Sequence, residues 1–214
     1  DDGTGKKEER LKIIREKSVG DYVWNDVSKN DWPNATLSAE LNVGDYWTNN
    51  LGENAKNMID NAVWYLGGTS ATSASDSLTS QFYSYERGIT VYSGHSTSWT
   101  GQVGLMYPSD YGYATSGGTT ADRNTCLNKE LSNWNDSNFS DCINNNWLYE
   151  SGYYEWLITP LSDEFSAFLL GEGSYTNDTV DNDVYSVRPV VFLKSNIQIV
   201  DGDGSSSNPY ILQS

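Results

Sequence analysis

Histidine and cysteine, which often act as bases, nucleophiles or metal ligands, occur only as His95, Cys126 and Cys142. His95 lies in the segment SGHSTSW without a G-x-S-x-G motif, so a Ser-His-Asp triad is a poor interpretation and we expect a solvated loop histidine. The cysteines form no C-x-x-C motif. A loop of about 15 residues separates them, which favours a structural disulfide made in an oxidising compartment. The alternative is a pair of free thiols in a cytoplasmic protein.

Acidic side chains could supply the carboxylate pair of a glycosidase, for example Glu150 with Glu155 or with Asp163. The chain contains 29 Asp and Glu residues, however, so their abundance is no evidence that any two of them are paired. We therefore predict a protein that is not an enzyme and has no catalytic residues. A hydrolase of extracellular glycans is kept as an alternative.

Two acidic clusters, residues 177–185 and 201–204, offer the oxygen ligands that Ca²⁺ prefers. Neither cluster completes an EF-hand loop, because the spacing and the terminal Glu are absent. In residues 201–204 the Asp-Gly pairs are typical of turns in their own right. We assign no metal ligands and expect no cofactor, with Ca²⁺ as the only candidate.

Residues 153–185 form the best candidate surface for binding, because they combine Tyr with Asn, Asp, Ser and Gly. Tyrosine rings offer rigid contact area, and short polar side chains offer adaptable hydrogen bonds. The alternative is that the aromatic residues belong to the core, which we prefer for Trp156. The predicted ligand-binding residues are Tyr153, Tyr154, Asp163, Tyr175, Asn177, Asp178, Asp181, Asn182, Asp183 and Tyr185.

Composition limits the partners. The net charge of −16 excludes binding to nucleic acid and is unfavourable for an anionic membrane surface. The 15 Tyr and 8 Trp residues bring enough apolar area for a core, in a chain with only 20% charged residues. No signal peptide or transmembrane stretch is apparent, so we expect a mature or trimmed chain without direct membrane insertion.

The elements that position these residues suggest one α+β domain over residues 1–214, with short helices on an irregular, mostly antiparallel sheet. Residues 1–10 resemble a turn or linker, and residues 197–212 a C-terminal hairpin. We expect short helices near residues 36–41 (capped by Asn34 or Thr36), over 54–66 (ended by Gly67-Gly68), and in 120–134 (capped by Thr120 or Asp122). We expect strands at residues 81–94, 146–150, 153–160, 165–171 and 185–194, and turns after residue 107. The spacing at residues 11–15 fits a helix or a strand equally well, and its isoleucines favour a strand.

Several segments together resemble a known family: VGDYVWN, MIDNAVWYLGG, WTGQVGLMYPSDYGYA, YYEWLITP, YSVRPVVFLKS and GDGSSSNPYIL. In this order they are similar to a domain of uncharacterised surface proteins from gut Firmicutes, some with prepilin-type N-termini. That family is distantly similar to the C-type-lectin-like fold of formylglycine-generating enzymes and of the variable proteins of diversity-generating retroelements. Formylglycine-generating enzymes need a close pair of reactive cysteines, so the resemblance does not carry their activity to this chain.

The resemblance implies a late strand, SVRPVVFL, that closes the domain beneath a ligand face built from late loops. Arg188 would then anchor neighbouring loops through carbonyls or a carboxylate, and Pro189 would lie where no ladder donor is required. The alternative is an exposed arginine at a strand end.

We therefore expect an extracellular domain of a cell surface or pilus that binds a protein or glycan on another surface. The alternative is a structural subunit of an extracellular filament. In the family that the chain resembles, a further strand precedes the one matching residues 11–15. Without that strand, the edge from Leu11 to Arg15 would stay open, be covered within the chain, or pair with a second copy by strand exchange. A trimmed chain is the simpler explanation.

Overall fold

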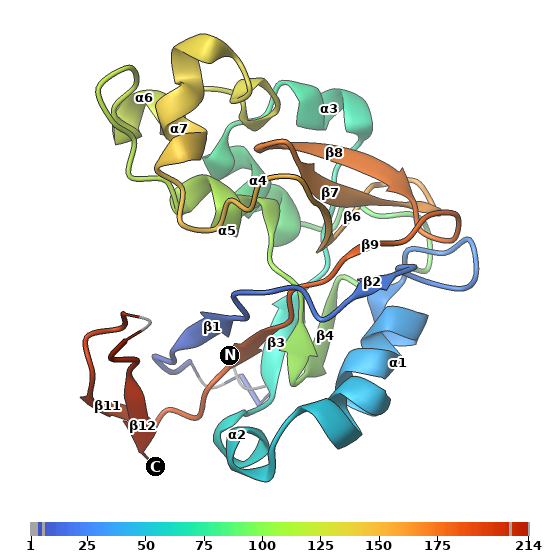
Figure 1. Cartoon of the computed structure of the whole chain (residues 1–214). Coiled ribbons are helices and arrows are strands. Elements are labelled where there is room, and N and C mark those ends of the chain that lie inside the picture. The colour runs from blue at the N-terminus through green and yellow to red at the C-terminus, as the bar shows by residue number, and fades with distance from the viewer. Residues whose placement is uncertain (1–3, 6, 206, 214) are drawn as a thin grey trace.

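The computed structural model describes residues 4–5, 7–205 and 207–213 (Figure 1). Its helices are short: α1 (Thr36–Asn42), α2 (Glu53–Met58), α3 (Ala71–Ser75), α4 (Thr79–Glu86), α5 (Pro108–Tyr113), α6 (Arg123–Leu127) and α7 (Ser140–Asn144). Single turns of 3₁₀ or π helix occur at η1 (Trp32–Asn34), η2 (Tyr46–Asn50), η3 (Leu131–Asn133) and η4 (Ser137–Phe139). In the described part of the chain no helix has the length and apolar content needed to span a bilayer.

The strands are equally short, with bounds β1 (Lys12–Ile14), β2 (Asp21–Tyr22), β3 (Ala62–Tyr65), β4 (Ser98–Gly101), β5 (Val103–Gly104), β6 (Tyr154–Pro160), β7 (Ser166–Gly171), β8 (Ser174–Thr179), β9 (Tyr185–Ser186), β10 (Val190–Phe192), β11 (Gln198–Asp201) and β12 (Ile211–Gln213). They form several small, mainly antiparallel sheets. The predicted combination of short helices with such sheets is confirmed.

The largest sheet has the strand order β2-β9-β6-β7-β8. Its neighbouring strands are antiparallel except β6 and β9, which are parallel. Strands β6 and β7 are buried along nearly all of their length, because their almost continuous apolar sequence suits strands covered on both faces. Helix α4 packs against this sheet, where the Phe82 ring lies 5.6 Å from the ring of Phe168 and 4.9 Å from that of Tyr175.

A second sheet has the order β1-β10-β5 and is antiparallel throughout. Strand β3 pairs with β4, and β11 pairs with β12 in a hairpin. Figure 1 shows α3 to α7 gathered around the five-stranded sheet, while the β11–β12 hairpin projects at the opposite end of the molecule. The predicted strand at residues 11–15 and the predicted C-terminal hairpin are both confirmed.

Five fully buried tryptophans tie distant segments together: Trp24, Trp32, Trp64, Trp134 and Trp156. A buried indole N–H needs an acceptor, and four of these donate to backbone carbonyls. The pairs are Trp24 with Leu157 (3.1 Å), Trp64 with Gly101 (3.1 Å), Trp134 with Cys126 (3.2 Å) and Trp156 with Tyr22 (2.8 Å). Each pair therefore adds a specific link to a large apolar contact.

Cys126 and Cys142 form a disulfide, as predicted, with their Cα atoms 5.5 Å apart. The bond joins α6 to α7, both of which contribute buried residues to the core. Closing a loop of this length contributes about 3 kcal/mol to stability in the chain-entropy model. The loop-rich region between the two helices is thus held by a covalent link.

Two predicted helices are confirmed in position, and their caps differ in outcome. Asp122, one of the two predicted caps, caps α6 by accepting a hydrogen bond from the Thr125 N–H at 2.7 Å. The caps predicted for α1 are wrong, because Ala35 occupies the cap position and makes no side-chain cap. The Thr36 hydroxyl instead accepts from the Asp26 N–H at 3.1 Å, which fixes the preceding loop.

Five element predictions are wrong in whole or in part, each because tertiary contacts override a local pattern. The helix predicted over residues 54–66 ends at Met58, and residues 62–65 form β3, with Trp64 buried against β4. The first part of the strand expected at 81–94 is the end of helix α4, and residues 87–94 are turn and coil. The turns expected after residue 107 include helix α5, which begins at Pro108. The strand at 146–150 is turn and coil, and the strand at 185–194 divides into β9 and β10.

Candidate functional site

Arg188 and Glu155 form a buried ion pair where the two larger sheets meet. The Arg188 Nε lies 2.9 and 3.0 Å from the two Glu155 carboxylate oxygens, and Nη2 lies 2.7 Å from Oε2. The same Nη2 donates to the Leu148 carbonyl at 2.7 Å. Only 6% of Arg188 and 5% of Glu155 is exposed, so the guanidinium holds a strand and a loop together from inside.

The chain accommodates Arg188 and Pro189 by interrupting the strand. The Val187 N–H bonds to the Gly20 carbonyl at 3.1 Å, which ends β9 against the β1–β2 connection. The Pro189 carbonyl accepts from the Arg15 N–H at 3.0 Å, but proline has no N–H to return. The pairing of β1 with β10 stops at this residue, which explains why an Arg-Pro pair is tolerated in an otherwise β-branched run.

A pocket of about 160 Å³ lies over this ion pair. Its lining comes from the β1–β2 connection, the segment before β6, strands β6, β7 and β9, and the β7–β8 turn: Lys17, Ser18, Tyr149, Glu150, Tyr153, Glu155, Leu170, Glu172, Gly173, Ser186 and Arg188. Two tyrosines, five charged side chains and two serines thus line one hollow. Such a mixture of rings and hydrogen-bonding groups suits a polar ligand.

The backbone of the β7–β8 turn fixes one wall of the pocket. Glu172 and Gly173 have φ angles of 52° and 80°, the left-handed conformation of a tight two-residue hairpin. Among the described residues Glu172 is the one non-glycine residue with a positive φ. The turn therefore holds the Glu172 side chain at the pocket instead of letting the chain continue along the sheet.

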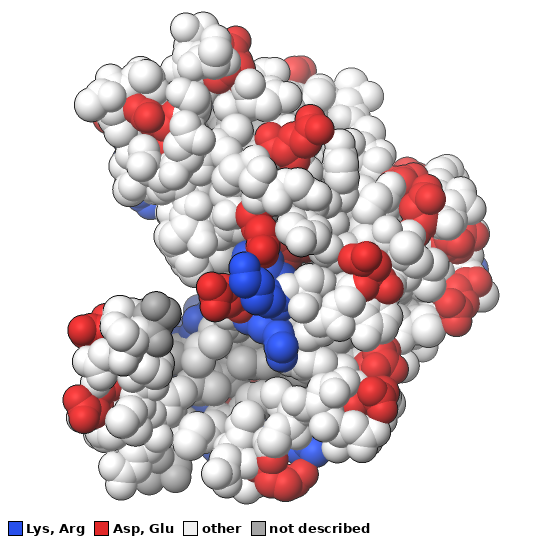
Figure 2. All heavy atoms as spheres, viewed as in Figure 1, with Lys and Arg blue, Asp and Glu red and all other residues white. Residues whose placement is uncertain are grey.

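A larger neighbouring pocket, of about 350 Å³, continues this hollow toward β1. The two pockets share Lys17, Tyr149, Glu150 and Arg188, and Lys17 binds Glu150 at 3.2 Å between them. Figure 2 shows Lys and Arg side chains gathered near the middle of this face, beside the hollow, whereas Asp and Glu are scattered over the rest. The hollow thus carries most of the positive charge visible on this face of an acidic molecule.

Of the residues predicted to bind a ligand, Tyr153 lines the pocket. A separate group forms around Tyr185, whose hydroxyl donates to Asp178 at 2.5 Å and whose ring lies 6.0 Å from that of Tyr154. The hydrogen bond to Asp178 and the nearby Asp183 carboxylate raise the pKa of Tyr185. These residues are at least partly exposed, and the structure places them together.

The other predicted residues lie apart. Tyr175 is buried and its ring belongs to the core beside Phe82. Asp163 closes the β6–β7 turn by accepting from the N–H groups of Phe165 and Ser166 at 3.0 and 2.7 Å. The remaining three, Asn177, Asp181 and Asn182, lie on β8 or just after it, and Asn182 donates to the Thr179 hydroxyl at 2.8 Å.

The prediction that His95 is solvated is wrong. Only 8% of its surface is exposed, and its two ring nitrogens contact the carbonyls of Ser96 (2.5 Å) and Asn30 (2.9 Å). These contacts attach the polar loop around His95 to η1 and its neighbours. Because both nitrogens face backbone oxygens, His95 is held as a structural link.

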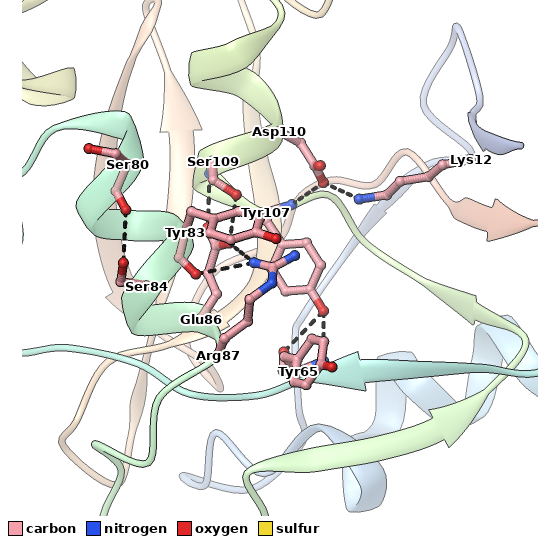
Figure 3. Close-up of polar contacts among 10 residues, drawn as sticks. All are labelled: Lys12, Tyr65, Ser80, Tyr83, Ser84, Glu86, Arg87, Tyr107, Ser109 and Asp110. Atoms are coloured by element: carbon pink, nitrogen blue, oxygen red, sulfur yellow. Dashed lines mark hydrogen bonds and ion pairs between the residues drawn. The ribbon is translucent and has the colours of Figure 1, made fainter. Parts of the chain in front are cut away.

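A buried carboxylate that the sequence did not reveal lies between α4 and α5 (Figure 3). The Ser109 N–H and hydroxyl donate to Glu86 at 2.9 and 2.6 Å, and Arg87 donates at 3.0 Å. Burial raises the pKa of Glu86 to about 7, although the bonds from Ser109 act in the opposite direction. Phe82 and Glu86 are four residues apart and therefore share one face of α4. Because a strand was predicted at residues 81–94, this buried face was not recognised from the sequence.

The acidic clusters considered for Ca²⁺ have local partners. Asp201 accepts from the Gly202 N–H at 2.7 Å, and Asp203 accepts from the Ser205 N–H at 2.9 Å, as in turns. Within the described residues no three or more His, Cys, Asp and Glu side chains are grouped so that they could hold a metal ion.

Sequence reasoning did not select Tyr149, Lys17 or Glu172 as site residues. Tyr149 lies within the segment 146–150 that was predicted as a strand, and Lys17 lies more than 130 positions before Glu150, to which it binds. Glu172 could have been found from the sequence, because a Glu-Gly pair between two strand-like segments indicates a hairpin turn. Comparison of the chain with protein-family models, curated proteins and solved structures found no match.

Proposed function

We propose that this chain is a non-enzymatic, extracellular domain that binds a glycan or a protein surface group in the pocket over Arg188 and Glu155. The observation that carries the proposal is the convergence of Tyr149, Tyr153 and Glu150 on one hollow beside Lys17. Aromatic rings stack on the apolar faces of sugars and side chains, while carboxylates and ammonium groups bind hydroxyls and amides. The proposed site is centred on the pocket over Arg188 and Glu155, and of the residues predicted to bind a ligand it includes Tyr153.

The state of Glu155 argues against the alternative of a glycan hydrolase, although Glu150 and Glu155 line the same pocket. A glycosidase requires one carboxylic acid that can give its proton to the leaving oxygen. Burial raises the pKa of Glu155, but its two oxygens are occupied by the Arg188 guanidinium. A carboxylate held in this way is a poor proton donor, so binding without turnover is the better interpretation.

The disulfide supports an extracellular setting, because such bonds persist in oxidising compartments. A C-type-lectin-like architecture and a place on a cell surface or pilus are part of the proposal. They are supported by the interrupted strand at Arg188 and Pro189, which closes the domain beneath the pocket, and by the resemblance of the sequence segments.

A glycan array followed by calorimetry on the best binder tests the proposal. We expect Tyr153→Ala to weaken binding at least about tenfold, the loss of one aromatic contact, with the unfolding midpoint unchanged. Tyr210→Ala is the matched control, since 53% of Tyr210 and 54% of Tyr153 is exposed. Equal effects of both variants, or turnover of chromogenic glycosides that Glu150→Gln abolishes, would contradict the proposal.

A further inference from the structure

Trp147 is far more exposed than most tryptophans of this chain. Its exposed fraction is 72%, whereas five of the eight Trp residues are fully buried. One exposed apolar side chain does not mark a site, because such side chains are common on protein surfaces. Its surroundings therefore decide whether Trp147 has a role in binding.

The backbone on both sides of Trp147 is anchored. The side chain of Asn146 donates to the Tyr111 carbonyl at 2.8 Å and accepts from the Leu148 N–H at 2.9 Å. Leu148 is buried, and its carbonyl accepts from Arg188 at 2.7 Å. The indole thus projects from a turn that is fixed on both sides, so a ligand that contacts it orders little additional chain.

Trp147 lines two pockets that adjoin the proposed site. The pocket of about 350 Å³ is lined by Trp147 and Tyr149, and a third pocket, of about 160 Å³, by Trp147 and by residues of β1, α5 and β10. Tyr149 also lines the first pocket, together with Tyr153. We call these three adjoining pockets the aromatic groove. Along it the exposed rings follow in the order Tyr153, Tyr149 and Trp147.

The charges of the aromatic groove nearly cancel. Its lining contains four Lys and Arg residues and five Asp and Glu residues. Three of the cations are bound to carboxylates of the same groove: Arg188 to Glu155, Lys17 to Glu150 and Lys12 to Asp110. A cationic ligand would have to compete with these ion pairs, and a polyanion is repelled by the net charge of −16.

A neutral sugar chain matches a surface of this kind. Pyranose rings have apolar C–H faces that stack on aromatic side chains, and their hydroxyl groups bind carboxylates, ammonium groups and guanidinium groups. In a linear oligosaccharide these faces and hydroxyls recur at every unit. Rings that follow one another along a groove can therefore contact successive sugars.

From the anchored and exposed Trp147, the three adjoining pockets and the paired charges, we propose that the ligand is a neutral, linear oligosaccharide that lies along the aromatic groove. Its successive sugar rings contact Tyr153, Tyr149 and Trp147. Trp147 then sets the preference for chain length, provided that the pocket over Arg188 and Glu155 binds a glycan as proposed.

A series of chain lengths tests the groove. The probes are cello-, manno- and chito-oligosaccharides, each from the monomer to the hexamer, measured by calorimetry or, for the shortest, by NMR titration. In the series that binds best, we expect affinity to rise at least about tenfold from monomer to hexamer, because longer chains reach further rings. Hexagalacturonate, a polyanion of the same length, should bind at least about tenfold more weakly. Equal affinity for monomer and hexamer, or tighter binding of the polyanion, would overturn the proposal.

Two variants test the contacts. Trp147→Ala and Tyr153→Ala should each weaken binding of the hexamer about tenfold. At most one of them should weaken binding of the monomer, because the two side chains line different pockets. Trp147→Phe, which keeps a ring, should retain most of the affinity. Val43→Ala is the control, since Val43 is also 72% exposed, and urea unfolding of every variant separates lost binding from lost folding.

The results distinguish this proposal from the proposed function. If Tyr153→Ala weakens hexamer binding and Trp147→Ala does not, the first pocket binds sugar but the groove does not, and only the present proposal is overturned. If none of the oligosaccharides binds, the present proposal fails. The proposed function fails with it when the glycan array also yields no ligand whose binding depends on Tyr153.

Discussion

At the scale of single residues, the Arg188–Glu155 pair joins the fold to the proposed site. Its four hydrogen bonds lie inside the protein, so removing one partner leaves a buried charge without compensation. We expect Arg188→Met to lower the free energy of unfolding by about 3–5 kcal/mol, measured in urea. Combining Arg188→Met with Glu155→Leu should cost less than Arg188→Met alone. A loss below about 1 kcal/mol in the single variant would mean that Glu155 is hydrated.

Glu86 gives the stability of the protein a pH dependence. Its pKa is about 7 in the folded protein and 4.5 ordinarily, so the folded state favours the protonated form. The resulting stabilisation is complete below about pH 4.5 and is lost as the pH rises through about 7. Glu86→Gln removes the titration, and relative to the parent protein it should gain up to about 3 kcal/mol between pH 4.5 and pH 8.

Urea titrations across this pH range measure that gain. The control is Glu53→Gln, whose carboxylate is 80% exposed and should show no such trend. Parallel pH profiles for Glu86→Gln and the parent protein would show that folding does not change the pKa of Glu86.

At the scale of elements, short helices α6 and α7 depend on their disulfide, since helices of five residues are not stable alone. Replacing both cysteines by serine should lower the free energy of unfolding by about 3 kcal/mol through the entropy of the unfolded chain. Peptide mass spectrometry without reduction should show the Cys126–Cys142 link. The reductant dithiothreitol should destabilise the parent protein and leave the double variant unchanged, and equal responses would contradict this account.

At the scale of the whole molecule, a net charge of −16 repels itself in the folded state. Raising the ionic strength from about 0.01 M to about 0.1 M shortens the Debye length from about 30 to about 10 Å. We expect the unfolding temperature to rise over this range, because the exposed ion pairs lost to screening contribute at most about 1 kcal/mol each. Sucrose at matched osmolality is the control. A fall in the unfolding temperature would mean that ion pairs outweigh the repulsion.

Much of the fold follows from local patterns in the sequence. Residues 153–160 and 165–171 are apolar runs bounded by turn residues, and they form β6 and β7. The C-terminal hairpin and the cap of α6 at Asp122 could also be predicted from the sequence, because turns and caps depend on few neighbouring residues. Residues 62–65 and 79–86 could not, since short apolar segments suit a helix and a strand equally until their partners are known.

The candidate site divides in the same way. The sequence alone determined that the protein is acidic, rich in tyrosine and tryptophan, able to form one disulfide, and unusual at Arg188 and Pro189. Only the tertiary structure decided that Glu155 receives Arg188, that Lys17 meets Glu150, and that Tyr153 faces a pocket while Tyr175 enters the core. Composition and turn chemistry act over a few residues, whereas this site depends on contacts between residues 33 positions apart (Glu155 and Arg188) and 133 positions apart (Lys17 and Glu150). Those contacts are fixed by packing, which no local pattern encodes.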